Sequence, residues 1–158
     1  MNRVHHVSWC LEPESMDAAK AMWEQQLGVE LIDFVLEADG LRVLLAWDAG
    51  VEIISPHGPP GPAGTMVRTH LDKHGEGVYA TVLLTDDFES VESGMKAVGS
   101  KLVHPEEAVI EGVPLPNGVV TGDNDSVDSQ PGFVLSGGLF DDVHGMRLAF
   151  QQFRPIGR

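Results

Sequence analysis

Cysteine is almost absent from this sequence: Cys10 is the only one among 158 residues. A lone cysteine excludes a disulfide within the chain and excludes a cysteine-rich zinc site. It is also the usage expected in the reducing cytoplasm, where disulfides are rare. We therefore expect a cytoplasmic protein that is stabilised by a hydrophobic core, to which the 42% of hydrophobic residues contribute.

Positive charge is also scarce. Ten lysine and arginine residues stand against 24 aspartate and glutamate residues, which leaves a formal net charge of −14 at pH 7. A field of that sign repels the phosphates of nucleic acids and of anionic membranes. No apolar run approaches the ~20 residues that a membrane-spanning helix needs, and the N-terminal residues MNRVHHVSW lack the charged-then-apolar order of a signal peptide. The partners that remain are small molecules and other copies of the chain.

The first third of the chain contains a strand, a helix and three further strands in that order. Residues 4–10, VHHVSWC, are rich in β-branched and aromatic side chains and predict a short buried strand. Residues 16–27 place apolar side chains at spacings of three and four, which predicts a helix that ends at Gly28. Three strand-like runs follow, separated by turn residues: VELIDFVLEADG, LRVLLAWDAG and VEIISP. Residues 1–56 therefore predict a βαβββ module.

The same order returns in residues 77–158, which we interpret as a second βαβββ module. VYATVLL predicts a strand, DDFESVESGMKAVG predicts a helix, and strands are expected around KLVH, GFVLSGGLF and MRLAFQQF. Residues 57–76 begin with a proline- and glycine-rich run and can end in a short helical turn, so we interpret them as a linker. Residues 104–131 form a long irregular loop in this interpretation. Loops of this length are usually lids, interface arms or disordered insertions, and our hypothesis is a lid over the ligand site.

The duplicated βαβββ order resembles the vicinal oxygen chelate superfamily, and within it the methylmalonyl-CoA epimerases in particular. Those enzymes have a first strand of the type I-D-H-V, a helix ending F-Y-x-x-x-L-G-L-E-L, and the later motifs V-E-L-L-E-P and F-L-E-K-H-G-E-G-L-H-H followed by V-D-D-I-E. The corresponding stretches here are VHHV, MWEQQLGVEL, VEIISP, HLDKHGEGVYA and TDDFES. The resemblance covers nearly the whole chain and implies an α+β fold, in which two βαβββ modules form a cupped, barrel-like mixed sheet. It also implies a homodimer, since family members commonly dimerise.

The resemblance implies a metal site in which each module supplies two inward-facing ligands to a divalent cation. In the first module these positions correspond to His6 and Glu52, and both residues are suitable ligands. In the second module they correspond to Ala80 and Ala149, which have no lone pair to offer. One imidazole and one carboxylate fall short of the three or four protein ligands that zinc and related sites use. We therefore expect no resident cofactor, and a divalent metal only if the long loop or a partner chain supplies further ligands.

The remaining pair could act without a metal. An imidazole beside a carboxylate is a workable general base near neutral pH, because the carboxylate fixes the tautomer and stabilises the charged ring. His6 and Glu52 are therefore the candidate catalytic residues, although they could equally be a satisfied remnant of an ancestral metal site. Arg147, Gln151 and Tyr79 are the candidate substrate-binding residues, the first two because they share the inward face of the last strand with Ala149.

Three functions remain open at this point. The first is an enzyme that transfers a proton, isomerises or acts as a lyase next to a carbonyl group without a metal, with Arg147 or backbone amides stabilising oxyanion charge. Epimerase activity itself is not expected, because Val43 stands where the epimerases have a second proton-transfer glutamate. The second function is metal-free binding or sequestering of a small molecule, as in bleomycin-resistance members of the superfamily. The third is a metalloenzyme that is completed by the loop or by a partner chain.

Overall fold

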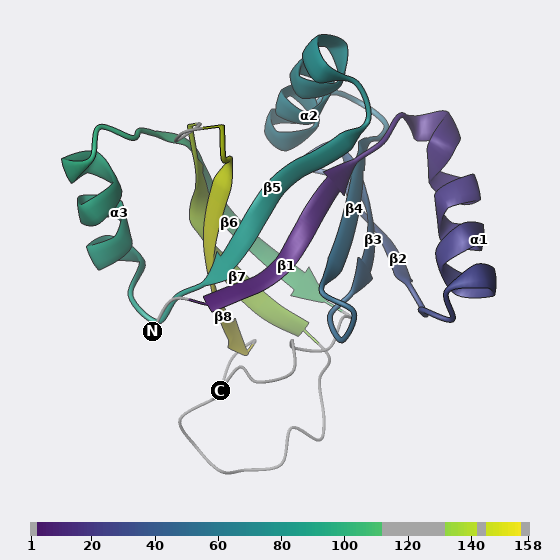
Figure 1. Cartoon of the computed structure of the whole chain (residues 1–158), viewed down its shortest axis with the longest axis horizontal. Helices are drawn as coiled ribbons and strands as arrows, with labels where there is room; N and C mark the ends of the chain where they lie inside the picture. Colours follow the sequence, from purple (N-terminus) through teal and green to yellow (C-terminus); the bar gives the residue numbers. More distant parts are fainter. Residues whose placement is uncertain (1–2, 112–131, 142–144, 156–158) are drawn as a thin grey trace. The chain divides into compact units, whose positions relative to one another are not determined.

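The computed structural model describes residues 3–111, 132–141 and 145–155 of the chain, and Figure 1 shows its helices and strands. In chain order they are β1 (Arg3–Cys10), a 3₁₀ turn (Pro13–Ser15), α1 (Met16–Gln26), β2 (Ile32–Leu36), β3 (Leu41–Ala46), β4 (Val51–Pro56), α2 (Pro62–His74), β5 (Gly77–Leu84), α3 (Phe88–Ala97), β6 (Leu102–Glu111), β7 (Gly132–Phe140) and β8 (Leu148–Pro155). The order βαβββ occurs twice, as β1-α1-β2-β3-β4 and as β5-α3-β6-β7-β8. The duplicated arrangement predicted from the sequence is therefore confirmed. None of the helices in the described ranges is long and apolar enough to cross a membrane.

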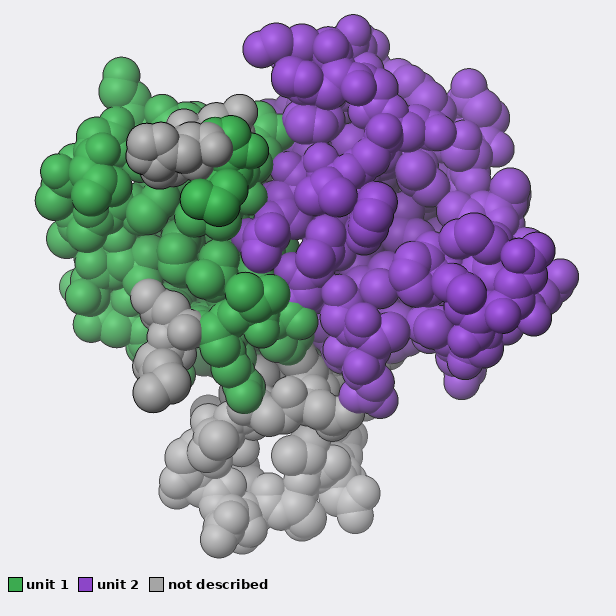
Figure 2. Space-filling model, viewed as in Figure 1, with its two compact units in different colours: residues 1–5, 82–158 green, residues 6–81 purple. Residues whose placement is uncertain are grey.

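The chain divides into two compact units, which Figure 2 colours separately. Unit 2 consists of residues His6–Thr81, and unit 1 consists of the described residues before His6 and after Thr81. The division falls inside β1 and inside β5, so that each of these strands contributes one end to each unit. The compact units therefore differ from the two sequence repeats.

In unit 2 the strands follow the order β2-β3-β4-β1-β5. The pairs β2–β3 and β3–β4 are antiparallel, whereas β1 and β4 are parallel, with Ser8 opposite Glu52. Helix α1 packs on this sheet through Met16, which is fully buried against a cluster of aliphatic side chains from β3 and β4. Gly28, in the left-handed conformation at φ 67°, follows the end of α1 as the sequence predicted.

Helix α2 occupies much of the predicted linker and is longer than the short helical turn expected there. Its first helical residue is Pro62, a position where the missing N–H costs no hydrogen bond. Gly64 then brings the helix against the turn between β2 and β3, and its N–H donates to the carbonyl oxygen of Asp39 at 2.8 Å. A Cβ atom at Gly64 would overlap the carbonyl oxygen of Gly40. The glycines of this segment therefore permit a close helix contact rather than a flexible linker.

In unit 1 the strands follow the order β1-β5-β8-β7-β6, and β6–β7 and β7–β8 are antiparallel pairs. Its core is aromatic: Phe133 and Phe140 are fully buried, and their rings contact those of Phe153 and Phe150 edge to face. Asp87 caps the N-terminus of α3 by accepting a hydrogen bond from the N–H of Ser90.

Strand β6 corrects part of the predicted loop over residues 104–131. Residues 104–111 are extended and pair with β7, so the expectation of irregular chain from His104 onward is wrong for them. Side chains of β6 alternate between more exposed and less exposed positions, as in a strand that covers a core on one side. Pro105 and the two glutamates after it are residues typical of a loop. A strand at the edge of a sheet tolerates them, because a proline there breaks no ladder hydrogen bond and charged side chains reach solvent. Residues 112–131, and with them most of the proposed lid, lie outside the described residues.

Candidate functional site

The candidate site begins with the alternation of β1. His6 and Ser8 are each 2% exposed and Cys10 is fully buried, while the side chains at positions 5, 7 and 9 are more exposed. Successive side chains of a strand point to opposite faces, so His6, Ser8 and Cys10 share one buried face of β1. This is the face that was predicted for the candidate catalytic histidine.

The carboxylate of Glu52, in β4, lies next to the imidazole of His6. The Nε2 atom of His6 lies 3.6 Å from the Oε2 atom of Glu52, which is an ion-pair separation rather than a hydrogen bond. The histidine side chain is almost fully buried, whereas the glutamate side chain keeps 21% of its surface exposed. A carboxylate at this separation can stabilise an imidazole ring that has just accepted a proton.

Trp47 supplies an apolar neighbour to the histidine ring. It lies in the turn between β3 and β4, and its ring centroid is 5.5 Å from that of His6 at an interplanar angle of 67°. This edge-to-face contact restricts rotation of the imidazole. Trp47 could not be identified from the sequence, because nothing in the local pattern indicates which strand the β3–β4 turn faces.

Ser8 is the second residue that the sequence analysis missed. Its hydroxyl oxygen is buried and has no hydrogen-bond partner among the described residues. A buried hydroxyl without a partner is costly, so its presence beside His6 and opposite Glu52 needs a reason. A signal was available in the sequence, because the alternation that places His6 inward also places Ser8 inward.

The donor set does not fit a resident divalent ion. Ala80 and Ala149, at the two remaining family positions, are each 3% exposed and carry no ligating atom. Among the described residues no group of three or more histidine, cysteine, aspartate or glutamate side chains is arranged to hold a metal. His6 and Glu52 alone are fewer ligands than a structural or catalytic zinc site uses. The absence of a metal cofactor stays a prediction, and the argument for it is the chemistry of the two alanines.

The other predicted residues have different surroundings. Tyr79 is buried, and its ring contacts that of His70 at a centroid distance of 5.1 Å, so it takes part in the packing of α2. In unit 1, Arg147 is half-buried just before β8, and Gln151 is buried within that strand. The Nε2 atom of Gln151 donates to the Oε2 atom of Glu106 in β6 at 2.8 Å, while its Oε1 atom has no hydrogen-bond partner in the described chain.

No family model and no curated protein sequence matches the chain. Solved structures do match over nearly its whole length. A hypothetical protein from Bacillus halodurans has a TM-score of 0.66 at 14% identity, over 99% of this chain and 98% of that one. Methylmalonyl-CoA epimerase from Streptomyces coelicolor, in complex with 2-nitronate-propionyl-CoA, has a TM-score of 0.62 at 16% identity, over 95% and 93%. The enzyme from Mycobacterium tuberculosis has a TM-score of 0.57 at 14% identity, over 96% and 88%.

These likenesses show the fold. The chain has the vicinal oxygen chelate fold, built from two βαβββ modules, as the sequence motifs predicted. Identities of 14% and 16% do not carry an activity from one protein to the other, since one scaffold supports many chemistries.

Proposed function

We propose that the protein is a small-molecule enzyme that moves a proton on the carbon next to a carbonyl group, with His6 as the base. The observation that carries the proposal is the buried His6 imidazole, whose Nε2 atom lies 3.6 Å from the carboxylate of Glu52. The fold supports it as well, because similar structures include enzymes named as epimerases. Isomerisation and lyase reactions beside a carbonyl both begin with this step.

The proton and the electrons of this step all come from the substrate, and one side chain accepts the proton. The unprotonated ring nitrogen of His6 takes the proton from the carbon next to the carbonyl. The electron pair of the broken C–H bond forms a C=C double bond, and the π pair of the carbonyl moves to its oxygen, which gives an enolate. The imidazolium that results is stabilised by the carboxylate of Glu52. Return of the proton to the same or to the neighbouring carbon regenerates the neutral ring and completes an isomerisation.

Ser8 supplies the group that an enolate needs. Its buried hydroxyl lies on the same face of β1 as His6, and it can donate a hydrogen bond to an oxygen that gains negative charge. A donor held inside the protein costs no reorganisation when that charge develops, which is the usual origin of oxyanion stabilisation. We propose the hydroxyl of Ser8 as this donor.

Solvent deuterium exchange tests the proposal without knowledge of the natural substrate. The protein is incubated in D₂O with a panel of carbonyl compounds: acyl thioesters, 2-keto acids, 2-hydroxy ketones and 2-hydroxy aldehydes. Incorporation of deuterium next to the carbonyl is followed by proton NMR. We expect exchange with at least one class, and a loss of about 10²–10⁴-fold in His6→Gln, the range that general-base catalysis contributes. His57→Gln, at an exposed position in the same unit, is the matched control.

The possible results of this experiment distinguish the three functions. Exchange that survives His6→Gln unchanged would contradict the assignment of the base. Tight binding of a panel member without any exchange would favour the metal-free binding protein instead. Exchange that appears only after addition of zinc, cobalt, manganese or iron(II) would favour the metalloenzyme.

A further inference from the structure

The opposite face of β1 lines an apolar pocket. Trp9, which points away from the His6 side of the strand, is 36% exposed and faces the apolar side of α1, where Ala19, Met22 and Trp23 lie. The space among them has a volume of about 480 Å³, which is within the usual range of small-molecule sites. All residues of this pocket belong to unit 2. The pocket has no part in the proton-transfer proposal.

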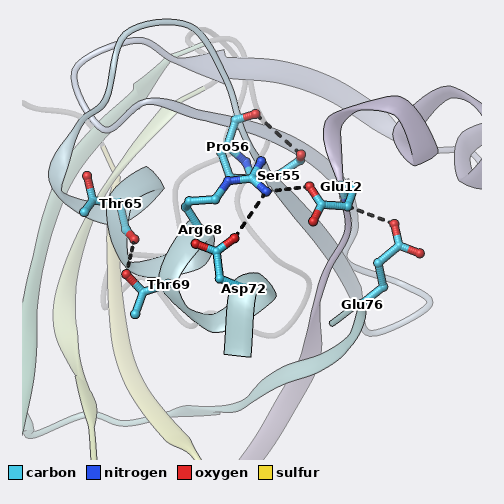
Figure 3. A network of polar contacts seen from close by, with 8 residues as sticks. All are labelled: Glu12, Ser55, Pro56, Thr65, Arg68, Thr69, Asp72 and Glu76. Atoms are coloured by element: carbon cyan, nitrogen blue, oxygen red, sulfur yellow. Dashed lines mark hydrogen bonds and ion pairs between the residues drawn. The ribbon is translucent and has the colours of Figure 1, made fainter. Parts of the chain in front are cut away.

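One end of the pocket carries a fixed negative charge. Glu76 lines it, and the Oε1 atom of Glu76 accepts a hydrogen bond from the backbone N–H of Glu12 at 2.9 Å (Figure 3). The hydroxyl of Ser15, also in the pocket, donates to the same carboxylate. These two hydrogen bonds, with that of Ser15 the stronger, hold the pKa of Glu76 below its ordinary value, so the group stays ionised at neutral pH.

The neighbouring cation is already paired with other carboxylates. Arg68 of α2 contacts Oε2 of Glu12 at 2.6 Å and Oδ1 of Asp72 at 3.9 Å (Figure 3). No lysine or arginine is among the described residues that line the pocket. A carboxylate has about four acceptor positions, so two hydrogen bonds leave Glu76 able to attract a further positive group.

We infer that this pocket binds a small organic cation with an apolar body, such as a tertiary or quaternary ammonium attached to an aromatic or aliphatic group. Tryptophan is the best partner for a cation over its ring face, and two tryptophans line the pocket. The apolar side chains of α1 accommodate the body of such a ligand, while Glu76 provides the opposite charge. The net charge of −14 attracts cations over a longer range and repels organic anions.

A pair of isosteric probes tests the charge directly. Para-trimethylammonio-benzyl alcohol and para-tert-butylbenzyl alcohol have nearly the same shape and differ in the positive charge. Binding to the full chain is measured by tryptophan fluorescence and by calorimetry. We expect the cation to bind at least 10-fold more tightly than the neutral alcohol. Glu76→Gln, which keeps a carbonyl oxygen to accept the hydrogen bond from Glu12 and removes the charge, should abolish that preference.

Two further variants test whether the cation binds in this pocket. Trp9→Leu removes one aromatic face at a partly exposed position and should weaken cation binding at least 5-fold. Glu30→Gln removes one negative charge from an exposed position of the same unit and should leave binding unchanged. Both variants are checked for an unchanged melting temperature, so that a loss of binding is not a loss of fold.

Three results would overturn the inference. Equal affinity for the two probes, unaffected by Glu76→Gln, would mean that the pocket accepts neutral apolar molecules. No binding of the cation at millimolar concentration would mean that it is not a ligand site. Self-association of the chain that Trp9→Leu abolishes in sedimentation experiments would mean that a second copy covers the pocket.

Discussion

The imidazole of His6 and the carboxylate of Glu52 face one another across the parallel pair of β1 and β4, with 3.6 Å between Nε2 and Oε2. The residue directly opposite Glu52 in the register is Ser8, one step along the same face of β1. An imidazole, a carboxylate and a hydroxyl group therefore lie close together on these two strands, and the proposed proton transfer uses all three. The proposed proton transfer therefore predicts a different effect for substitution of each residue.

Glu52→Gln should lower the rate of deuterium exchange about 10²-fold, since the imidazolium loses its compensating charge in a buried site. The apparent KM should change little, because Glu52 acts on His6 and not on the substrate. Initial exchange rates at several substrate concentrations separate the two parameters. An increase in KM at unchanged kcat would mean that Glu52 binds substrate instead.

Ser8→Ala should make the protein more stable and less active. Removing a buried hydroxyl that has no partner in the described structure relieves a desolvation cost of about 1–3 kcal/mol. The same change removes the proposed donor to the enolate oxygen, so kcat should fall about 10-fold or more. Urea denaturation measures the free energy of unfolding, and NMR measures the exchange. Higher stability with undiminished kcat would show that the hydroxyl is only a packing defect.

Two glycine-to-alanine substitutions should have opposite effects on stability. Gly64→Ala forces a methyl group onto the carbonyl oxygen of Gly40 and should destabilise the protein by about 1–3 kcal/mol. Gly94→Ala, inside α3 with no atom within 4 Å of the new methyl group, should stabilise it by about 0.5–1 kcal/mol through helix propensity. Thermal and urea unfolding of both variants check the prediction. A neutral Gly64→Ala would mean that α2 does not press against the β2–β3 turn.

The pair of Asp33 and Arg42 should make stability depend on acid pH. Arg42 donates from Nε and Nη2 to the two carboxylate oxygens of Asp33, at 3.0 and 2.8 Å, and this holds the pKa of Asp33 below its ordinary value. A carboxyl group with a lowered pKa contributes stability that is present above its unfolded pKa and is lost as the pH falls through the folded one. Asp33→Asn should therefore be less stable than the parent at pH 7 by up to about 1 kcal/mol, allowing for solvent screening.

The difference should then shrink toward zero at a pH below both values, where Asp33 is neutral in the parent as well. Parallel urea denaturation of the two proteins at pH 7 and at a series of lower pH values measures it. A difference that stays constant across this range would mean that the carboxylate charge is not what stabilises the pair.

Removal of metal ions should leave exchange activity unchanged. Ala80 and Ala149 provide no ligands, so the proposed step depends on His6, Glu52 and Ser8 alone. The protein is dialysed against a chelator, its metal content is measured by plasma mass spectrometry, and the exchange rate is compared before and after. Loss of activity that stoichiometric zinc or cobalt restores would show that further ligands complete a metal site.

The sequence was sufficient for features that depend on local periodicity. The two βαβββ repeats were predictable because apolar residues alternate with period two in strands and recur at three and four in helices. The inward direction of His6 was implied by the family resemblance, and the alternation added that Ser8 and Cys10 share its face. Strand β6 was only partly predicted, since Pro105 and two successive glutamates resemble a loop unless the strand lies at an edge. Helix α2 was underestimated because its glycines and prolines resemble a flexible linker in sequence, although they permit a close contact.

Tertiary structure alone decided which distant side chains meet. The sequence by itself determined that the chain has two repeats, that His6 faces inward, and that Ala80 and Ala149 cannot bind a metal. The 3.6 Å separation of His6 and Glu52, the contact of Trp47 with the imidazole, and the pocket that Trp9 shares with Glu76 depend on strand register and helix packing. Register is set by the packing of whole strands against one another, and no local pattern encodes which residues it brings face to face.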